Sequence, residues 1–184
     1  KKIYLKNNKD IKLRYNLAVM QQELGLLDEA ETNYISLIEN HEDSKYKINL
    51  YNLYITKKLY ENALDLINSI QSKNLSLIQV NQDKAYILYL LKNYDDSINQ
   101  CYQILKIDGK NVSALNTLGL CFLQLQKYYD ANKILLKAIS LDEENIILLN
   151  SLGRLNHQLR KSKEAESYFD KAITLQPNNF ETLN

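Results

Sequence analysis

The chain has 184 residues, and 23 Lys and Arg balance 22 Asp and Glu to give a formal net charge of +1. Lysines stand mostly singly and near acids, without the clustered Arg and Lys that mark a nucleic-acid interface. No apolar run is long enough for a transmembrane span or a signal peptide. The two cysteines lie among apolar neighbours and do not make a disulfide framework, so we expect both to be buried. We therefore expect a cytoplasmic protein whose partners are neither nucleic acid nor membrane.

Small residues recur at a nearly constant interval along the chain. One series is separated by 33, 34, 34 and 34 residues and consists of Ala30, Ala63, Ser97, Ala131 and Ala165. A second series lies 12 residues before the first, and four of its five members are small: Ala18, Tyr51, Ala85, Gly119 and Gly153. An internal period of this length is typical of proteins built from stacked helical repeats.

Within one period the apolar spacing is helical. Residues 112–145 contain a first stripe at i, i+3, i+4 and i+7, made of Leu115, Leu118, Gly119 and Phe122. A second stripe follows the polar turn at Gln126-Lys127 and comprises Tyr128, Ala131, Leu135 and Ala138. Such a short link predicts that the two helices lie side by side and antiparallel. No stretch alternates apolar and polar residues with a period of two, so we expect no strands.

These residues resemble the tetratricopeptide repeat, a helix-turn-helix unit of 34 residues. The likeness is carried by Leu118-Gly119, Leu152-Gly153, Phe122, the alanines at 131, 138, 165 and 172, and Leu175-Gln176-Pro177. It implies an all-α fold, a right-handed α-solenoid of stacked antiparallel helix pairs. The repeats would be 11–43, 44–77, 78–111, 112–145 and 146–179. Tyr51 and Lys84 depart from the pattern, because a small residue and a Leu are usual at those places.

The two ends carry partial units. Residues 1–10 resemble the tail of a preceding unit, with the end of a helix and a linker, and residues 180–184 resemble the start of a further unit. Neither resembles the polar capping helix that normally ends a solenoid. We therefore expect these 184 residues to be part of a longer chain, or their ends to be covered by a partner.

Motifs for chemistry are absent from the sequence. It holds no glycine-rich phosphate loop, nucleophile elbow or metal-binding spacing of His and Cys. His41 and His157 have no second His or Cys at a spacing that would bind a metal. Acidic pairs such as Asp95-Asp96 fall at the starts of helices, where the positive end of the helix dipole stabilises them. We expect neither catalysis nor a cofactor or metal.

The remaining candidate is the side of each first helix opposite its stacking stripe. The family resemblance implies that this side lines a concave groove that binds proteins or peptides. In the first two repeats the same side also carries Tyr15, Val19, Glu23 and Thr56. The predicted binding residues are Asn16, Asn49, Asn52, Asp83, Tyr86, Asn116, Leu120, Asn150 and Arg154. Amides can donate to and accept from an extended backbone, but Asn is abundant throughout this chain, so the convex face, edges and loops stay open as alternatives.

The function predicted is a non-catalytic scaffold or adaptor, a subunit of a larger assembly that holds peptide segments or partner subunits. The alternative is a substrate-recruiting arm of a larger enzyme, such as a glycosyltransferase resembling O-GlcNAc transferase, whose asparagine ladder is here interrupted by Asp83, Thr117 and Ser151. A third hypothesis is a self-associating stack. The chaperone-binding carboxylate clamp of the family is not expected, because its positions are occupied by other groups.

Overall fold

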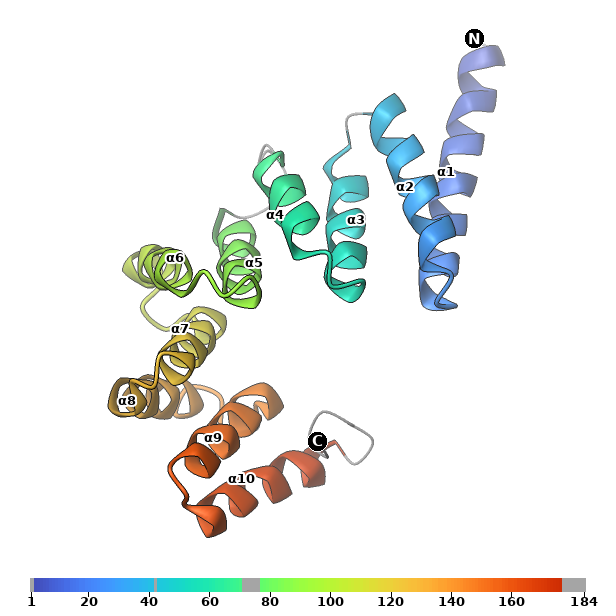
Figure 1. Ribbon diagram of the computed structural model, residues 1–184. Helices are drawn as coiled ribbons and strands as arrows, with labels where there is room; N and C mark the ends of the chain where they lie inside the picture. The colour runs from blue at the N-terminus through green and yellow to red at the C-terminus, as the bar shows by residue number, and fades with distance from the viewer. Residues whose placement is uncertain (1, 42, 71–76, 177–184) are drawn as a thin grey trace. The chain divides into compact units, whose positions relative to one another are not determined.

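The structure is a computed structural model that describes residues 2–41, 43–70 and 77–176, with side chains from residue 10 onward except that of Leu77. This part of the chain is all-α. Its helices are α1 (Lys2–Glu23), α2 (Leu27–Asn40), α3 (Ser44–Thr56), α4 (Tyr60–Asn68), α5 (Leu77–Leu90), α6 (Tyr94–Ile107), α7 (Val112–Gln124), α8 (Tyr128–Ile139), α9 (Ile146–Gln158) and α10 (Ser162–Leu175) (Figure 1). The prediction of stacked antiparallel helix pairs is confirmed.

Each pair turns through the same backbone motif. The residue two positions after the first helix has a positive φ at Gly25, Lys58, Lys92, Gln126 and Arg160. The N–H of the following residue then donates to the carbonyl five residues back, as Lys127 does to Phe122 at 2.8 Å. This is the Schellman arrangement, which satisfies the last carbonyls of a helix. Because it reverses the chain within three residues, the second helix must run back alongside the first.

The entrances to several first helices are capped by side chains. Asn111 and Asn145 accept hydrogen bonds from the N–H groups of Ala114 and Leu148, and Asp43 accepts from Lys45. Second helices begin without such a cap. Each of them instead has Asp or Glu in its first turn, next to the positive end of the helix, as the acid-rich entries of the sequence predicted.

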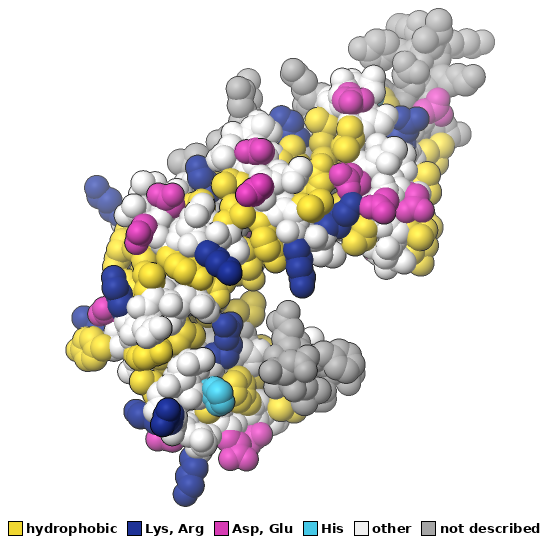
Figure 2. All heavy atoms as spheres, viewed as in Figure 1, with side chains coloured by type: hydrophobic (Ala, Val, Ile, Leu, Met, Phe, Trp, Pro, Cys, Tyr) yellow, Lys and Arg dark blue, Asp and Glu magenta, His cyan; other side chains and the backbone are white. Residues whose placement is uncertain are grey.

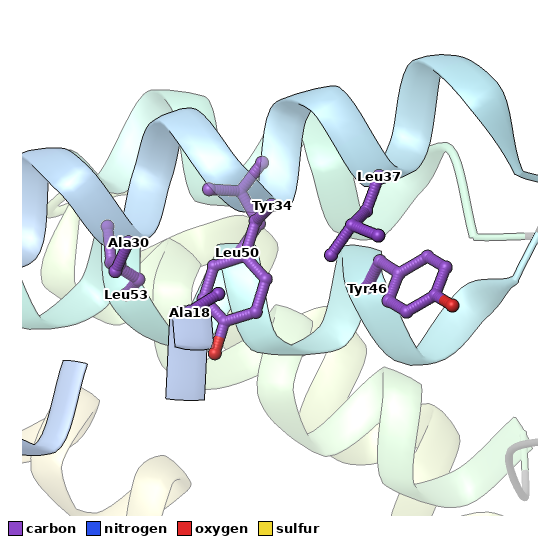
Figure 3. Packing of buried hydrophobic residues seen from close by; sticks show 7 residues of the cluster. All are labelled: Ala18, Ala30, Tyr34, Leu37, Tyr46, Leu50 and Leu53. Carbon is purple, nitrogen blue, oxygen red and sulfur yellow. The ribbon is translucent and has the colours of Figure 1, made fainter. Parts of the chain in front are cut away.

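The chain divides into two compact units, Lys1–Val80 and Asn81–Asn184. In the first unit, α2 packs against both α1 and α3. Figure 3 shows the core, in which Ala30, Tyr34 and Leu37 of α2 face Tyr46, Leu50 and Leu53 of α3, with Ala18 of α1 beside them. Ion pairs add to this contact, because Lys57 Nζ lies 2.6 Å from Asp28 Oδ1 and 2.5 Å from Glu31 Oε2.

In the second unit, α8 packs against α7 and α9, and α10 against α9. The glycines of the period lie where helices of one pair cross. A Cβ on Gly119 would lie 2.6 Å from Leu135 Cγ, and one on Gly153 would lie 2.5 Å from Phe169 Cε1. Both glycines therefore make room for a large side chain of the second helix.

The third repeat has Ser97 where its neighbours have alanine, and the buried hydroxyl is satisfied. Ser97 Oγ donates to the carbonyl oxygen of Ala85 at 2.7 Å, and Cys121 Sγ donates to Ser97 Oγ at 3.3 Å. Cys101 and Cys121 are both buried, as the sequence predicted. Burial raises the pKa of the Cys101 thiol to about 12, so neither geometry nor protonation favours reactivity.

The beginning of the chain differs from the expectation. Residues 2–10 are the first part of α1, which is one unbroken helix from Lys2 to Glu23. The sequence had suggested the end of a helix followed by a linker at residues 1–10. Lys and Asn at these positions do not interrupt a helix as Gly or Pro would. The predicted further unit at 180–184 lies outside the described residues.

Candidate functional site

A pocket with a volume of about 370 Å³ lies between α1, α2 and α3 in the first unit. Five of its lining residues belong to the side of the first helices that the sequence selected, namely Tyr15, Val19, Glu23, Asn49 and Thr56. Gln22, Leu27 and Tyr34 complete the lining. The volume falls in the lower part of the range found for ligand pockets, enough for one or two side chains of a peptide.

The floor of this pocket is fixed by hydrogen bonds between tyrosines and amides. Asn49 Nδ2 donates to Tyr15 Oη at 2.8 Å, and Tyr34 Oη donates to Gln22 Oε1 at 3.1 Å. Burial, together with the nearby Tyr15 and Glu23, raises the pKa of Tyr34 to about 12. Its phenol therefore stays a neutral donor across the physiological range, and Glu23 at the rim brings a carboxylate to the lining.

The bond between Asn49 and Tyr15 has a counterpart in the second unit. Ser151 Oγ donates to Asn116 Oδ1 at 2.8 Å, and these two residues occupy the same places in their repeats as Asn49 and Tyr15. In both units a side chain on one first helix thus reaches back to the first helix of the preceding repeat. Asn49 and Asn116, two of the predicted amides, therefore form hydrogen bonds between consecutive repeats. The sequence of a single repeat cannot predict such a bond.

Asn150 differs from the other amides. Its Oδ1 atom is buried and makes no hydrogen bond within the described residues. A buried acceptor without a donor costs free energy, about 1–3 kcal/mol in mutational studies. On the same helix Arg154 and Ile147 are exposed, so a ligand over α9 would meet an amide acceptor, a guanidinium and an apolar side chain.

The other predicted residues are not brought into one cavity. Asn116 and Leu120 are buried, so they present little surface to a partner. Asn16 and Asn52 are exposed in the first unit but do not line the pocket. In the second unit Asp83 is half-buried, and Tyr86 is exposed and stacks on Tyr89 with ring centroids 6.0 Å apart.

Three residues that line the pocket were not among those predicted from the sequence. Tyr34 and Leu27 belong to the second helix, whereas the prediction considered first helices only. Gln22 lies seven residues after Tyr15, which is two helical turns along the same side, and that spacing could have identified it.

A larger pocket, of about 560 Å³, lies elsewhere in the second unit. It is bounded by α10, Leu149 of α9 and the acidic turn at Glu143 and Glu144. Its charged lining on α10 combines two cations with two anions, namely Lys163, Lys171, Glu166 and Asp170. Because these charges are mixed and lie on the solvent side, the arrangement does not select a ligand of one sign.

Metal-binding clusters and membrane-spanning helices can be looked for in the described part of the chain. No group of three or more His, Cys, Asp or Glu within residues 2–41, 43–70 and 77–176 could hold a metal ion. Among the same residues, no helix combines the length and hydropathy that crossing a bilayer requires. Charges of both signs alternate over the face seen in Figure 2, as on an ordinary solvated surface.

Comparison with known proteins agrees with this geometry. The family model described as tetratricopeptide repeat matches residues 112–145 and 147–179. These two stretches are tetratricopeptide repeats. No curated protein matches the chain in sequence.

Solved tetratricopeptide repeat structures share its fold at low sequence identity. TTC0263, a thermophilic protein of this family from Thermus thermophilus, is 14% identical with a TM-score of 0.76, over 94% of this chain and 95% of that one. Residues 41 to the end of MamA from Desulfovibrio magneticus RS-1 are 18% identical with a TM-score of 0.69, over 92% and 96%. YrrB, which has an unusual peptide-binding site, is 17% identical with a TM-score of 0.61, over 99% and 94%. At these identities the likeness concerns the fold alone. The tetratricopeptide repeat in general supports a protein-interaction scaffold, and proteins built from it are typically non-catalytic.

Proposed function

We propose that the chain is a non-catalytic adaptor that binds an extended segment of a partner protein along the inner side of its first helices. The pocket between α1, α2 and α3 carries this proposal, because residues from three helices and two repeats converge on one hollow. In the proposed complex one side chain of the segment fills the hollow above Val19 and Tyr34, and its backbone runs past Asn49. The solved relative YrrB also has a peptide-binding site, in line with this use of the fold.

The chemistry of the lining selects the segment. Val19, Leu27 and the ring of Tyr34 favour an apolar or aromatic side chain, while the Glu23 carboxylate at the rim favours a neighbouring basic residue. Asn49 uses one of its four hydrogen-bonding positions on Tyr15, and an amide can serve a peptide group with the others. We place the adaptor in a cytoplasmic multi-protein assembly.

Selection of peptides from a random display library tests the proposal. Thr56→Trp fills the mouth of the pocket from an exposed position, and Asn49→Ala removes the amide. Peptides selected by the unaltered protein should share an apolar residue beside a basic one, and both variants should bind them at least about tenfold more weakly. Asn52→Ala, on the same helix but outside the pocket, is the matched control and should bind normally. Equal affinity of Thr56→Trp and the unaltered protein would place the site elsewhere.

A further inference from the structure

Three tyrosines form a row where α5 is followed by α6, the third helix pair in Figure 1. This tyrosine row consists of Tyr86 and Tyr89, one turn apart on α5, and Tyr94, the first residue of α6. The ring centroids of Tyr86 and Tyr89 are 6.0 Å apart, and those of Tyr89 and Tyr94 are 6.1 Å apart. Tyr86 is 40% exposed, and the other two are half-buried. The rings are therefore in successive contact, and solvent reaches the row chiefly at Tyr86.

The tyrosine row occupies the places that line the pocket of the first repeat. Two periods earlier these places hold Val19, Gln22 and Leu27, all of which line the pocket between α1, α2 and α3. In the fourth repeat the first two places hold Leu120 and Leu123, which are only 6% exposed. Among the five repeats, the third alone has an aromatic residue at all three places. The third repeat thus offers aromatic rings on the side of the first helix where the first repeat has a hollow.

The row is uncharged, and the charges around it do not suit a nucleic acid. Burial, together with the nearby Tyr89 and Cys121, raises the pKa of Tyr94, so its phenol stays neutral at physiological pH. Bases of a single strand also stack on aromatic rings, but such sites combine the rings with a basic groove for the phosphates. Residues 83–96 contain three acids and two lysines. The row therefore favours a ligand that is recognised through ring contacts and hydrogen bonds alone.

A proline-rich segment has these properties. In the polyproline II conformation the chain advances about 3.1 Å per residue, so that one turn of three residues, about 9 Å long, covers two neighbouring rings of the row. Its carbonyl groups have no internal hydrogen bonds and can accept from phenol hydroxyls. Because the conformation is already formed before binding, little conformational entropy is lost on a shallow surface. A flexible apolar segment would lose more on the same surface.

We propose that the tyrosine row binds a proline-rich segment of a partner protein in the polyproline II conformation. Proline rings of the segment stack on Tyr86 and Tyr89, and its carbonyl groups accept hydrogen bonds from the phenols. The row lies within residues 81–184, whereas the pocket between α1, α2 and α3 belongs to the other compact unit. The inference therefore does not rest on that pocket.

Fluorescence anisotropy with a fluorescein-labelled decaproline peptide tests the inference on the 184-residue chain. We expect saturable binding that Tyr86→Ala, which removes the most exposed ring of the row, weakens about tenfold. Tyr86→Phe keeps the ring and should lose less affinity than Tyr86→Ala. Tyr102→Ala removes an exposed tyrosine of α6 outside the row, so it is the matched control and should bind normally. Thermal unfolding followed by circular dichroism checks that all three variants are folded.

Competition and a pocket variant separate this surface from other sites and other ligands. Oligothymidine and maltohexaose should not displace the labelled decaproline, and a labelled Gly-Ser peptide of equal length should not bind. Thr56→Trp, which fills the pocket of the first unit, should leave decaproline binding unchanged, so failure of that pocket and failure of the row are distinguishable. Absence of saturable decaproline binding, equal affinity of Tyr86→Ala and the unaltered protein, or equal losses in Tyr86→Ala and Tyr86→Phe would overturn the inference. Displacement by either competitor, or loss of binding in Thr56→Trp, would overturn it as well.

Discussion

Replacement of Gly119 by alanine should push α7 and α8 apart. The added Cβ would lie 2.6 Å from both Cγ and Cδ2 of Leu135, whereas carbon atoms in contact prefer about 3.5–4.0 Å, so one partner must move by about 1 Å. Leu135 is fully buried, and the clash involves its Cγ rather than only the end of the side chain. Overpacking of this kind costs about 1–3 kcal/mol. Alanine recovers roughly 1 kcal/mol of helix propensity relative to glycine, so we expect a net loss of up to about 2 kcal/mol.

A double-mutant cycle separates these two contributions. Leu135→Ala alone should cost about 2–5 kcal/mol by leaving a cavity. On that background the clash is gone, so Gly119→Ala should stabilise the protein by roughly 1 kcal/mol through helix propensity alone. Urea unfolding followed by circular dichroism at 222 nm gives the four free energies. Gly109→Ala is the control, because its Cβ would make only an ordinary 3.6 Å contact with the Leu105 carbonyl oxygen. If Gly119→Ala has the same effect with and without Leu135, the close crossing does not constrain residue 119.

Three further outcomes follow from the repeats. Gln126→Gly should stabilise the protein by about 1 kcal/mol in thermal or urea unfolding, because φ is 58° at Gln126 and only glycine adopts that region without cost; a loss of stability would contradict the turn assignment. Leu50→Ala should cost about 2–5 kcal/mol and Leu17→Ala under about 1 kcal/mol, although both occupy the same place in their repeats, because Leu50 is buried and Leu17 half exposed. Finally, the native Cys101 pKa of about 12 lies above its ordinary value of 9.0, so the unfolded chain alone loses this proton between those values. Stability should be independent of Cys101 below about pH 9 and fall as pH rises above it, and Cys101→Ala should reduce that fall in urea unfolding at stepped pH.

Much of the fold could be predicted because the residues that recur with the period are buried. Ala18, Ala30, Ala63, Ala131 and Ala165 are all at most 3% exposed, since a small residue at a helix crossing is a steric requirement that leaves few alternatives. The extent of α1 could not be predicted in this way. Its first residues, 2–10, include both apolar and polar side chains, and no proline or glycine among them fixes where the helix starts.

The candidate site could be predicted less completely, for a reason visible in Asn49 and Asn116. The helical period places both on the correct side, but it says nothing about the side chain one repeat away that each contacts. Those contacts, to Tyr15 and Ser151, are hydrogen bonds between repeats. Pocket residues from second helices, such as Tyr34, were likewise missed because a pocket depends on where two helices diverge. The boundaries of the five repeats and the role of the predicted residues stay predictions.

The last two repeats, which the family model matches, fill the crossing of their two helices in the same way. There the first helix has Gly119 or Gly153 and the second has Leu135 or Phe169, so a missing side chain is matched by a large one. The third repeat solves the crossing differently, with Ala85 and a buried Ser97 whose hydroxyl is bound to the Ala85 carbonyl. The second accommodates the buried ring of Tyr51. What these repeats share is therefore a buried crossing, and the residues that fill it differ. Substitutions that keep this combined volume, made on both helices together, should preserve the stack where either one alone would not.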